Sequence, residues 1–121
     1  MQLHLSRVIL FTANMDQMVA FYRDALGLKL KTNDKDWKTF DAGACEIALH
    51  SGGGKPAPRS PKIQFDVKDV AATRVWLMAR GAKMGRVSSK DGLDLCGGKD
   101  PDGKPFSLSN AAPSRGRRTP C

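Results

Sequence analysis

RVILF at residues 7–11 and KIQFD at residues 62–66 align at a constant offset, and the alignment continues without a gap into the segments that follow. The two halves also end alike, because residues 46–51 and residues 105–110 share one pattern of apolar and polar side chains. Repetition at a fixed spacing is the sequence signature of a repeated structural unit. The chain therefore contains one unit twice.

Each unit is predicted to consist of a strand, a helix and then three strands. Residues 7–12 have the pattern of a strand. Asn14 is predicted to cap the first helix, with Gln17 completing a capping box, and Asp69 is the equivalent cap in the second unit. Gly27 supplies the left-handed residue that ends the first helix. The elements are expected at residues 7–12, 15–27, 28–33, 37–41 and 45–50, and again at residues 62–67, 69–80, 83–88, 93–96 and 105–109.

The repeat divides the chain into a first βαβββ unit at residues 1–51, a linker at 52–61, a second βαβββ unit at 62–110 and a basic tail at 111–121. Glycine and proline dominate the linker, which is typical of a connection that does not pack. The tail is expected to be disordered. A unit of about half this length would bury too little apolar surface to be stable alone. The prediction is an α+β fold whose two units share a core.

Composition places the chain among ordinary globular proteins. Of its 121 residues 40% are hydrophobic and 26% are charged, and no apolar run approaches the ~20 residues that a membrane span requires. The N-terminus lacks the order of a secretory signal, so we expect a cytoplasmic protein without a membrane partner. The net charge is +8, but the few aromatic residues are not interleaved with the basic ones. Nucleic acid is therefore not the expected partner.

The cysteines argue against a disulfide framework or a zinc ribbon. Cys45, Cys96 and Cys121 are far apart and odd in number, and no Cys-x-x-Cys pair is present. Cys45 shares the strand side of Ile47 and Leu49 and is expected to behave as a small buried hydrophobe.

Two phrases link this repeat to a known group of proteins. FYRDALGL at residues 21–28 ends the first helix, and DPDGKPFSL at residues 100–108 forms a turn followed by the last strand. In this order, on a tandem βαβββ repeat, they resemble the vicinal oxygen chelate superfamily, which includes glyoxalase I, extradiol dioxygenases, and bleomycin and fosfomycin resistance proteins. The resemblance implies that each unit curls into a half-open cup, that the two cups form one cleft, and that the protein is a homodimer.

The resemblance also implies where a metal would be held, and there the sequence departs from the family pattern. The four ligand positions map to Arg7, Ala48, Lys62 and Ser107, where metal-dependent members would usually carry His or Glu. A guanidinium has no lone pair to donate and alanine has no donor atom. Lysine would have to lose its proton, and a serine hydroxyl is a poor ligand for the usual divalent metals. We therefore expect no metal and no cofactor.

Strand alternation predicts which side chains line the cleft instead. The expected ligand-binding residues are Arg7, Phe11, Trp37, Glu46, His50, Lys62, Gln64 and Ser107. Arg7 and Lys62 could hold an anion between them. Alternatively they could pair internally with Glu46 and Asp66.

The expected function is to bind or sequester a small, possibly anionic molecule in this metal-free cleft. The alternative is an enzyme of the same superfamily, a lyase, an isomerase or a dioxygenase. Such an enzyme would use a non-standard metal site or acid–base chemistry, for which Glu46 and His50 are the catalytic candidates.

Overall fold

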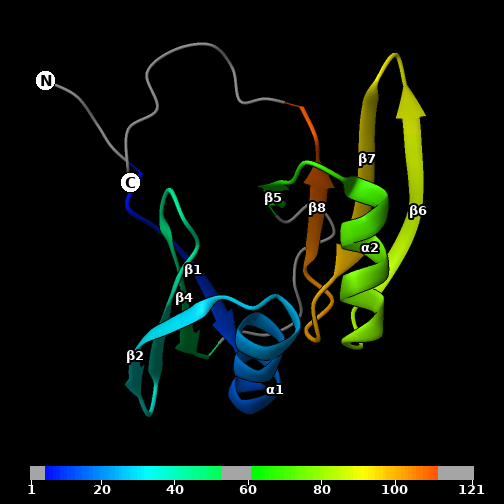
Figure 1. Ribbon diagram of the computed structural model, residues 1–121. Helices are drawn as coiled ribbons and strands as arrows, with labels where there is room; N and C mark the ends of the chain where they lie inside the picture. The colour runs from blue at the N-terminus through cyan, green and yellow to red at the C-terminus, as the bar shows by residue number, and fades with distance from the viewer. Residues whose placement is uncertain (1–4, 53–60, 112–121) are drawn as a thin grey trace, which may run out of the picture. The chain divides into compact units, whose positions relative to one another are not determined.

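The computed structural model describes residues 5–52 and 61–111 (Figure 1). The described chain forms two compact units, one in residues 5–52 and one in residues 61–111. The predicted linker at 52–61 and the predicted disordered tail at 111–121 lie almost wholly outside the described residues. Within the described residues, no helix is long and apolar enough to cross a membrane.

Both units have the predicted order of elements, and each folds into one mixed four-stranded sheet with helical structure after its first strand (Figure 1). Unit 1 consists of β1 (Arg7–Thr12), α1 (Met15–Ala20), the π-helical turn η1 (Phe21–Ala25), β2 (Lys29–Asp34), β3 (Trp37–Asp41) and β4 (Glu46–Ser51). Unit 2 consists of β5 (Ile63–Asp66), α2 (Val70–Ala79), β6 (Lys83–Lys90), β7 (Leu93–Lys99) and β8 (Pro105–Ser109). The α+β class and the tandem βαβββ repeat are thus confirmed.

The two sheets share one topology. Their strand orders are β1-β4-β3-β2 and β5-β8-β7-β6. In each sheet the first strand runs parallel to the last, and the other neighbours are antiparallel. A parallel pair needs a long crossover connection, and the helix and the middle strands of each unit supply it.

The two helices begin differently, and the predicted capping box in unit 1 is wrong. Asp69 caps α2, because its Oδ1 accepts a hydrogen bond from the Ala72 amide at 2.9 Å. Asn14 makes no such side-chain bond to α1. Its ψ of 57° differs from the extended 99° of Asp69, and its own amide donates to the Thr12 hydroxyl at 2.9 Å. With this backbone geometry, α1 begins without the side-chain cap that the sequence suggested.

The first helix ends in a wider turn than the sequence indicates. In η1 the Leu26 amide donates to the Phe21 carbonyl, and Gly27 follows at a φ of 74°. Phe21, Tyr22 and Ala25 are all buried in this turn. Phe21 lies three residues after Met18, so ordinary helical spacing also places it on the buried side.

Side chains alternate between two faces of each sheet. In unit 1 the helix side holds Phe40, Ile47 and Leu49, all 2% exposed or less, together with Met18 and Tyr22. In unit 2 the buried apolar side chains are Val70, Leu77, Cys96, Phe106 and Leu108. The opposite side of each sheet, which we call its open face, carries the residues that the sequence assigned to ligand binding.

Candidate functional site

The open face of unit 1 collects five of the eight predicted ligand-binding residues. The strand register places Arg7 beside Glu46 at one end. At the other end it places Phe11 beside His50 and His50 beside Trp37. Residues from three strands thus form a charged cluster and an aromatic cluster on a single surface.

Two ion pairs to Glu46 hold the charged cluster together. Arg7 Nη2 lies 2.7 Å and Lys31 Nζ 2.8 Å from the two carboxylate oxygens of Glu46. Hydrogen bonds from Lys31 and then from Arg7 lower the pKa of Glu46 below its ordinary value. A general base works best when its pKa is near the operating pH, so Glu46 is a poor base. Of the two roles considered for Arg7, the internal pair with Glu46 is the one present.

Lys31 was missed by sequence reasoning. The register of β2 against β3 shifts between Leu30 and Thr32. A shift of this kind changes which side chains reach a given face. Strand alternation alone carries no signal for it.

The aromatic cluster centres on His50. Its ring centroid lies 5.3 Å from that of Phe11 and 5.7 Å from that of Trp37, and Arg7 Cζ lies 5.3 Å from the Trp37 ring. Nδ1 of His50 is 2.8 Å from the Ser51 carbonyl oxygen. Because a carbonyl can only accept, Nδ1 carries the hydrogen in this contact, and Nε2 of the neutral ring is an acceptor.

One buried hydroxyl on the same face has no partner. Thr39 is 2% exposed, and its Oγ1 has no hydrogen-bond partner within the described residues. Thr39 pairs in register with Ala48 and lies two residues along β3 from Trp37, so its side chain belongs to the open face. Buried polar groups are normally hydrogen-bonded, and an exception calls for an explanation such as a bound water or ligand.

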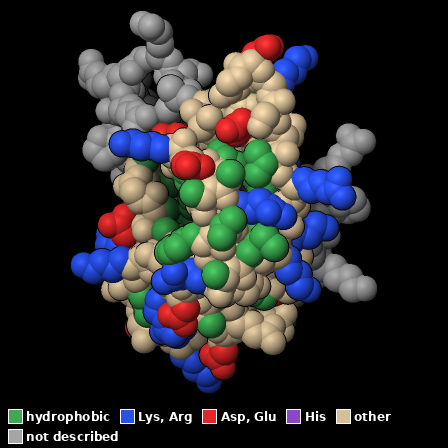
Figure 2. Space-filling view, turned by 45° about the vertical axis from the view of Figure 1, so that its right-hand side comes forward, with side chains coloured by type: hydrophobic (Ala, Val, Ile, Leu, Met, Phe, Trp, Pro, Cys, Tyr) green, Lys and Arg blue, Asp and Glu red, His purple; other side chains and the backbone are tan. Residues whose placement is uncertain are grey.

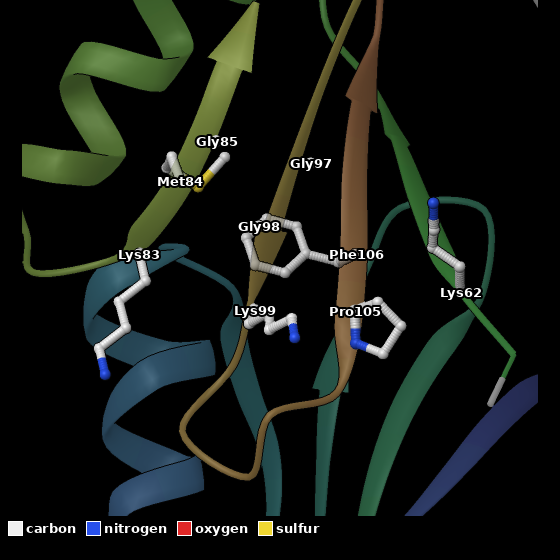
Figure 3. A pocket seen from close by; sticks show the side chains of 9 residues that line it. All are labelled: Lys62, Lys83, Met84, Gly85, Gly97, Gly98, Lys99, Pro105 and Phe106. Atoms are coloured by element: carbon white, nitrogen blue, oxygen red, sulfur yellow. The ribbon is translucent and has the colours of Figure 1, made fainter. Parts of the chain in front are cut away.

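Unit 2 contains a pocket of about 460 Å³ (Figure 3). Three lysines, Lys62, Lys83 and Lys99, contribute to its wall. The remaining lining residues are Met84, Gly85, Gly97, Gly98, Pro105 and Phe106. The register places Lys83 beside Lys99 and Lys99 beside Pro105, so adjoining strands bring these two lysines to one pocket.

Three glycines of the strands line this pocket. Gly85 lies in β6, and Gly97 and Gly98 lie in β7. None of the three needs the left-handed conformation. Glycine weakens a strand and often marks close approach of a ligand or another chain segment. The glycines of β7 are a signal in the sequence for this pocket, and neither they nor Lys83 and Lys99 are among the predicted ligand-binding residues.

The remaining predicted residues divide between the pocket and its border. Lys62 lines the pocket and has no ion pair with any residue in 5–52 or 61–111. Ser107 Oγ donates to Gln64 Oε1 at 3.1 Å, and Ser107 lies two residues along β8 from the lining residue Pro105. The predicted pairing of Lys62 with Asp66 is therefore absent, and Lys62 remains available to an anion.

The donor set does not fit the metal that the superfamily implies. Arg7, Ala48, Lys62 and Ser107 occupy the expected ligand positions. In register Ala48 is beside Ile9, and Ser107 is beside Gln64. The described residues contain no group of three or more His, Cys, Asp or Glu side chains that could hold a metal ion.

Comparisons with known proteins agree with this fold. Residues 7–109 match the family model described as "Glyoxalase-like domain". No match was found among curated protein sequences.

Three solved structures illustrate the likeness. SMU.1112c has a TM-score of 0.78 and 24% identity, over 87% of this chain and 96% of that one. A lactoylglutathione lyase from Agrobacterium tumefaciens has a TM-score of 0.70 and 19% identity, over 87% and 91%. TnmS3, an antibiotic binding protein from Streptomyces sp. CB03234, has a TM-score of 0.75 and 18% identity, over 88% and 94%. At these identities the likeness shows the fold alone.

Proposed function

The chain belongs to the glyoxalase-like domain family of the vicinal oxygen chelate superfamily, and on this premise we propose that it binds a small organic anion with an apolar body, without the help of a metal. The proposed site is the pocket of unit 2.

The observation that carries this proposal is the composition of the pocket wall. Lys62, Lys83 and Lys99 make no ion pair with a described residue. Three uncompensated cations raise the local concentration of anions. Phe106, Met84 and Pro105 offer apolar contact beside them. A volume of about 460 Å³ lies within the range of ordinary small-molecule sites.

Two observations favour binding over metal-assisted catalysis: the superfamily's four metal-ligand positions lack suitable donor atoms, and the Glu46 carboxylate is already ion-paired. Two cations hold this carboxylate, lower its pKa and weaken it as a base. The name of one structural neighbour describes an antibiotic binding protein, which is in keeping with a binding role. The name of another describes a lyase.

A metal-free acid–base enzyme is the second candidate, and one observation favours it. Because Nδ1 of His50 donates to the Ser51 carbonyl, Nε2 can accept a proton from a ligand on the open face of unit 1. Turnover that is lost in His50→Gln but kept in chelator would support this candidate.

A pair of fluorescent probes tests the binding proposal. 8-Anilinonaphthalene-1-sulfonate is an anion with an aromatic body, and N-phenyl-1-naphthylamine is the same body without the sulfonate. We expect the sulfonate to bind more tightly. Lys83→Gln and Lys99→Gln should each weaken it by about 1 kcal/mol, or about fivefold in Kd, and leave the neutral probe nearly unaffected. Lys90→Gln is the matched control, since Lys90 ends the same strand as Lys83 and does not line the pocket.

A second variant tests the place of binding. A Cβ on Gly97 would have 3.9 Å to its nearest neighbour, the Phe106 carbonyl oxygen, so Gly97→Leu is expected to fold and to occupy part of the pocket. Loss of sulfonate binding in this variant would support the site. Equal affinity of the sulfonate for the wild type, both lysine variants and Gly97→Leu would refute it.

A further inference from the structure

A row of four side chains crosses the pocket of unit 2 from strand to strand. In register, Lys83 of β6 lies beside Lys99 of β7, and Lys99 lies beside Pro105 of β8. The parallel β5–β8 ladder starts one residue after Lys62 and one residue after Pro105, so these two residues are neighbours as well. All four line the pocket. The order along the row is therefore lysine, lysine, proline, lysine.

One end of the row holds two like charges directly opposite each other. Residues paired in register across antiparallel strands have their Cβ atoms about 4.5–5.5 Å apart, and like charges in such a pair are destabilising. Lys83 and Lys99 form such a pair, and neither makes an ion pair with a described residue. An anion bound between the two ammonium groups would remove this repulsion. This end of the row is therefore suited to hold one acid group of a ligand.

The third lysine lies on the other side of an apolar wall. Neighbouring strands are about 4.7–4.9 Å apart, so two strand spacings put the backbone of Lys62 about 10 Å from that of Lys99. Figure 3 shows Pro105 and the Phe106 ring between Lys62 and the other two lysines. The Lys62 side chain does not point toward the other two in this view. The pocket thus offers positive charge on both sides of an apolar centre.

We propose that the pocket binds a dianion whose two acid groups stand at opposite ends of an apolar body. Lys83 and Lys99 together hold one acid group, Lys62 holds the other, and the body lies across β8 against Pro105 and Phe106. This inference rests on the binding function proposed above and narrows the ligand from organic anions in general to one class. A volume of about 460 Å³ accommodates such a molecule.

The overall charge of the chain has to be separated from this geometry. The net charge is +8, and Figure 2 shows hydrophobic side chains on one face of the protein with Lys and Arg side chains beside them. Such a surface attracts any dianion more strongly than a monoanion. Net charge alone does not distinguish two isomers of one dianion. The position of the second acid group is therefore the property to vary.

Two isomers of naphthalenedicarboxylate test the inference by displacing 8-anilinonaphthalene-1-sulfonate from the full chain. The 2,6 isomer carries its carboxylates at opposite ends of the ring system, and the 2,3 isomer carries both at one end. We expect the Kd of the 2,6 isomer to be about three- to fivefold lower than that of the 2,3 isomer. Lys62→Gln should bring the ratio of the two Kd values to about one, because it removes the cation that only the 2,6 isomer reaches. Lys62 is exposed and precedes the strand, so this variant is expected to fold.

Lys68→Gln is the matched control. It removes the same charge, but Lys68 follows β5 at the opposite end from Lys62 and does not line the pocket, so the ratio of the two Kd values should stay at its wild-type value. Equal affinity of the wild type for the two isomers would overturn the inference. So would a ratio that Lys62→Gln leaves unchanged. In both cases binding of the sulfonate at the pocket would leave the proposed function standing, whereas a chain that does not bind the sulfonate would refute both.

Discussion

Gly98 in strand β7 is predicted to be a position where a single methyl group is not tolerated. A Cβ built there would lie 2.7 Å from Met84 Sδ, 2.7 Å from Phe106 Cζ and 3.0 Å from the Lys83 carbonyl oxygen. Met84 can move its flexible end. Phe106 is only 2% exposed and its ring meets that of Phe65 at 6.2 Å. The Lys83 oxygen is part of the backbone. Gly98→Ala therefore has to displace a packed ring, a strand or both.

Gly97→Ala is the reference against which the cost of Gly98→Ala in the free energy of unfolding can be measured. Gly97 is in the same strand, and a Cβ there meets nothing closer than 3.9 Å. Replacing glycine by alanine at a compatible site stabilises a protein by about 0.4–1 kcal/mol, because the unfolded chain loses freedom. Both variants share this gain, while only Gly98→Ala adds overpacking, which costs about 1–3 kcal/mol. The two variants should thus differ by about 1–3 kcal/mol in the free energy of unfolding.

Urea unfolding followed by circular dichroism measures this difference. Gly97→Ala should be as stable as the wild type or more stable, and Gly98→Ala should be the least stable of the three. Gly98→Ala should also bind the sulfonate probe more weakly, because Met84 and Phe106 line the pocket. If Gly98→Ala matches Gly97→Ala in stability, the close packing of β7 against β6 and β8 that underlies the pocket argument is wrong.

Three further predictions follow from single residues. Ion pairs lower the pKa of Glu46 in the folded protein, so they stabilise the fold above the ordinary carboxyl pKa, and this stabilisation is lost as pH falls through the lowered pKa. Glu46→Gln lacks these ion pairs. Acid titration followed by circular dichroism should therefore show a smaller loss of stability for this variant than for the wild type. Burial raises the pKa of the Cys96 thiol, so peptide mapping after brief alkylation at neutral pH should find Cys96 modified more slowly than Cys45, and equal rates would contradict this. Asp69→Ala removes the cap of α2 and should cost about 1 kcal/mol in urea unfolding, whereas Asn14→Ala, lacking that bond, should cost less.

Most of the fold could be predicted from the sequence because its signals are local. The alternation along β1 and the glycine at the end of η1 depend only on neighbouring residues, and both are present in the structure. The capping box at Asn14 failed because the Asn14 backbone adopts a geometry that a list of residue types does not reveal. The wide turn of η1 is likewise invisible to a pattern that assumes uniform helical spacing.

The candidate site was predicted less completely because it depends on register. Alternation correctly placed Arg7, Phe11, Glu46 and His50 on one face of unit 1. It could not find Lys31, which reaches Glu46 from a strand with shifted register. Lys83 and Lys99 were missed because no resemblance points to them, and their significance appears only when β6 lies beside β7.

The sequence by itself determined the duplication, the order of the elements and the absence of lone-pair donors at the superfamily's metal positions, because each of these is a property of residue identity and spacing along the chain. Only the tertiary structure decided that three lysines and three glycines meet at one pocket, that Glu46 is neutralised by two cations, and that Lys62 lies across β8 from the other two lysines. These features join residues that are distant in sequence. Strand pairing and packing settle such relations, and neither can be read from spacing alone.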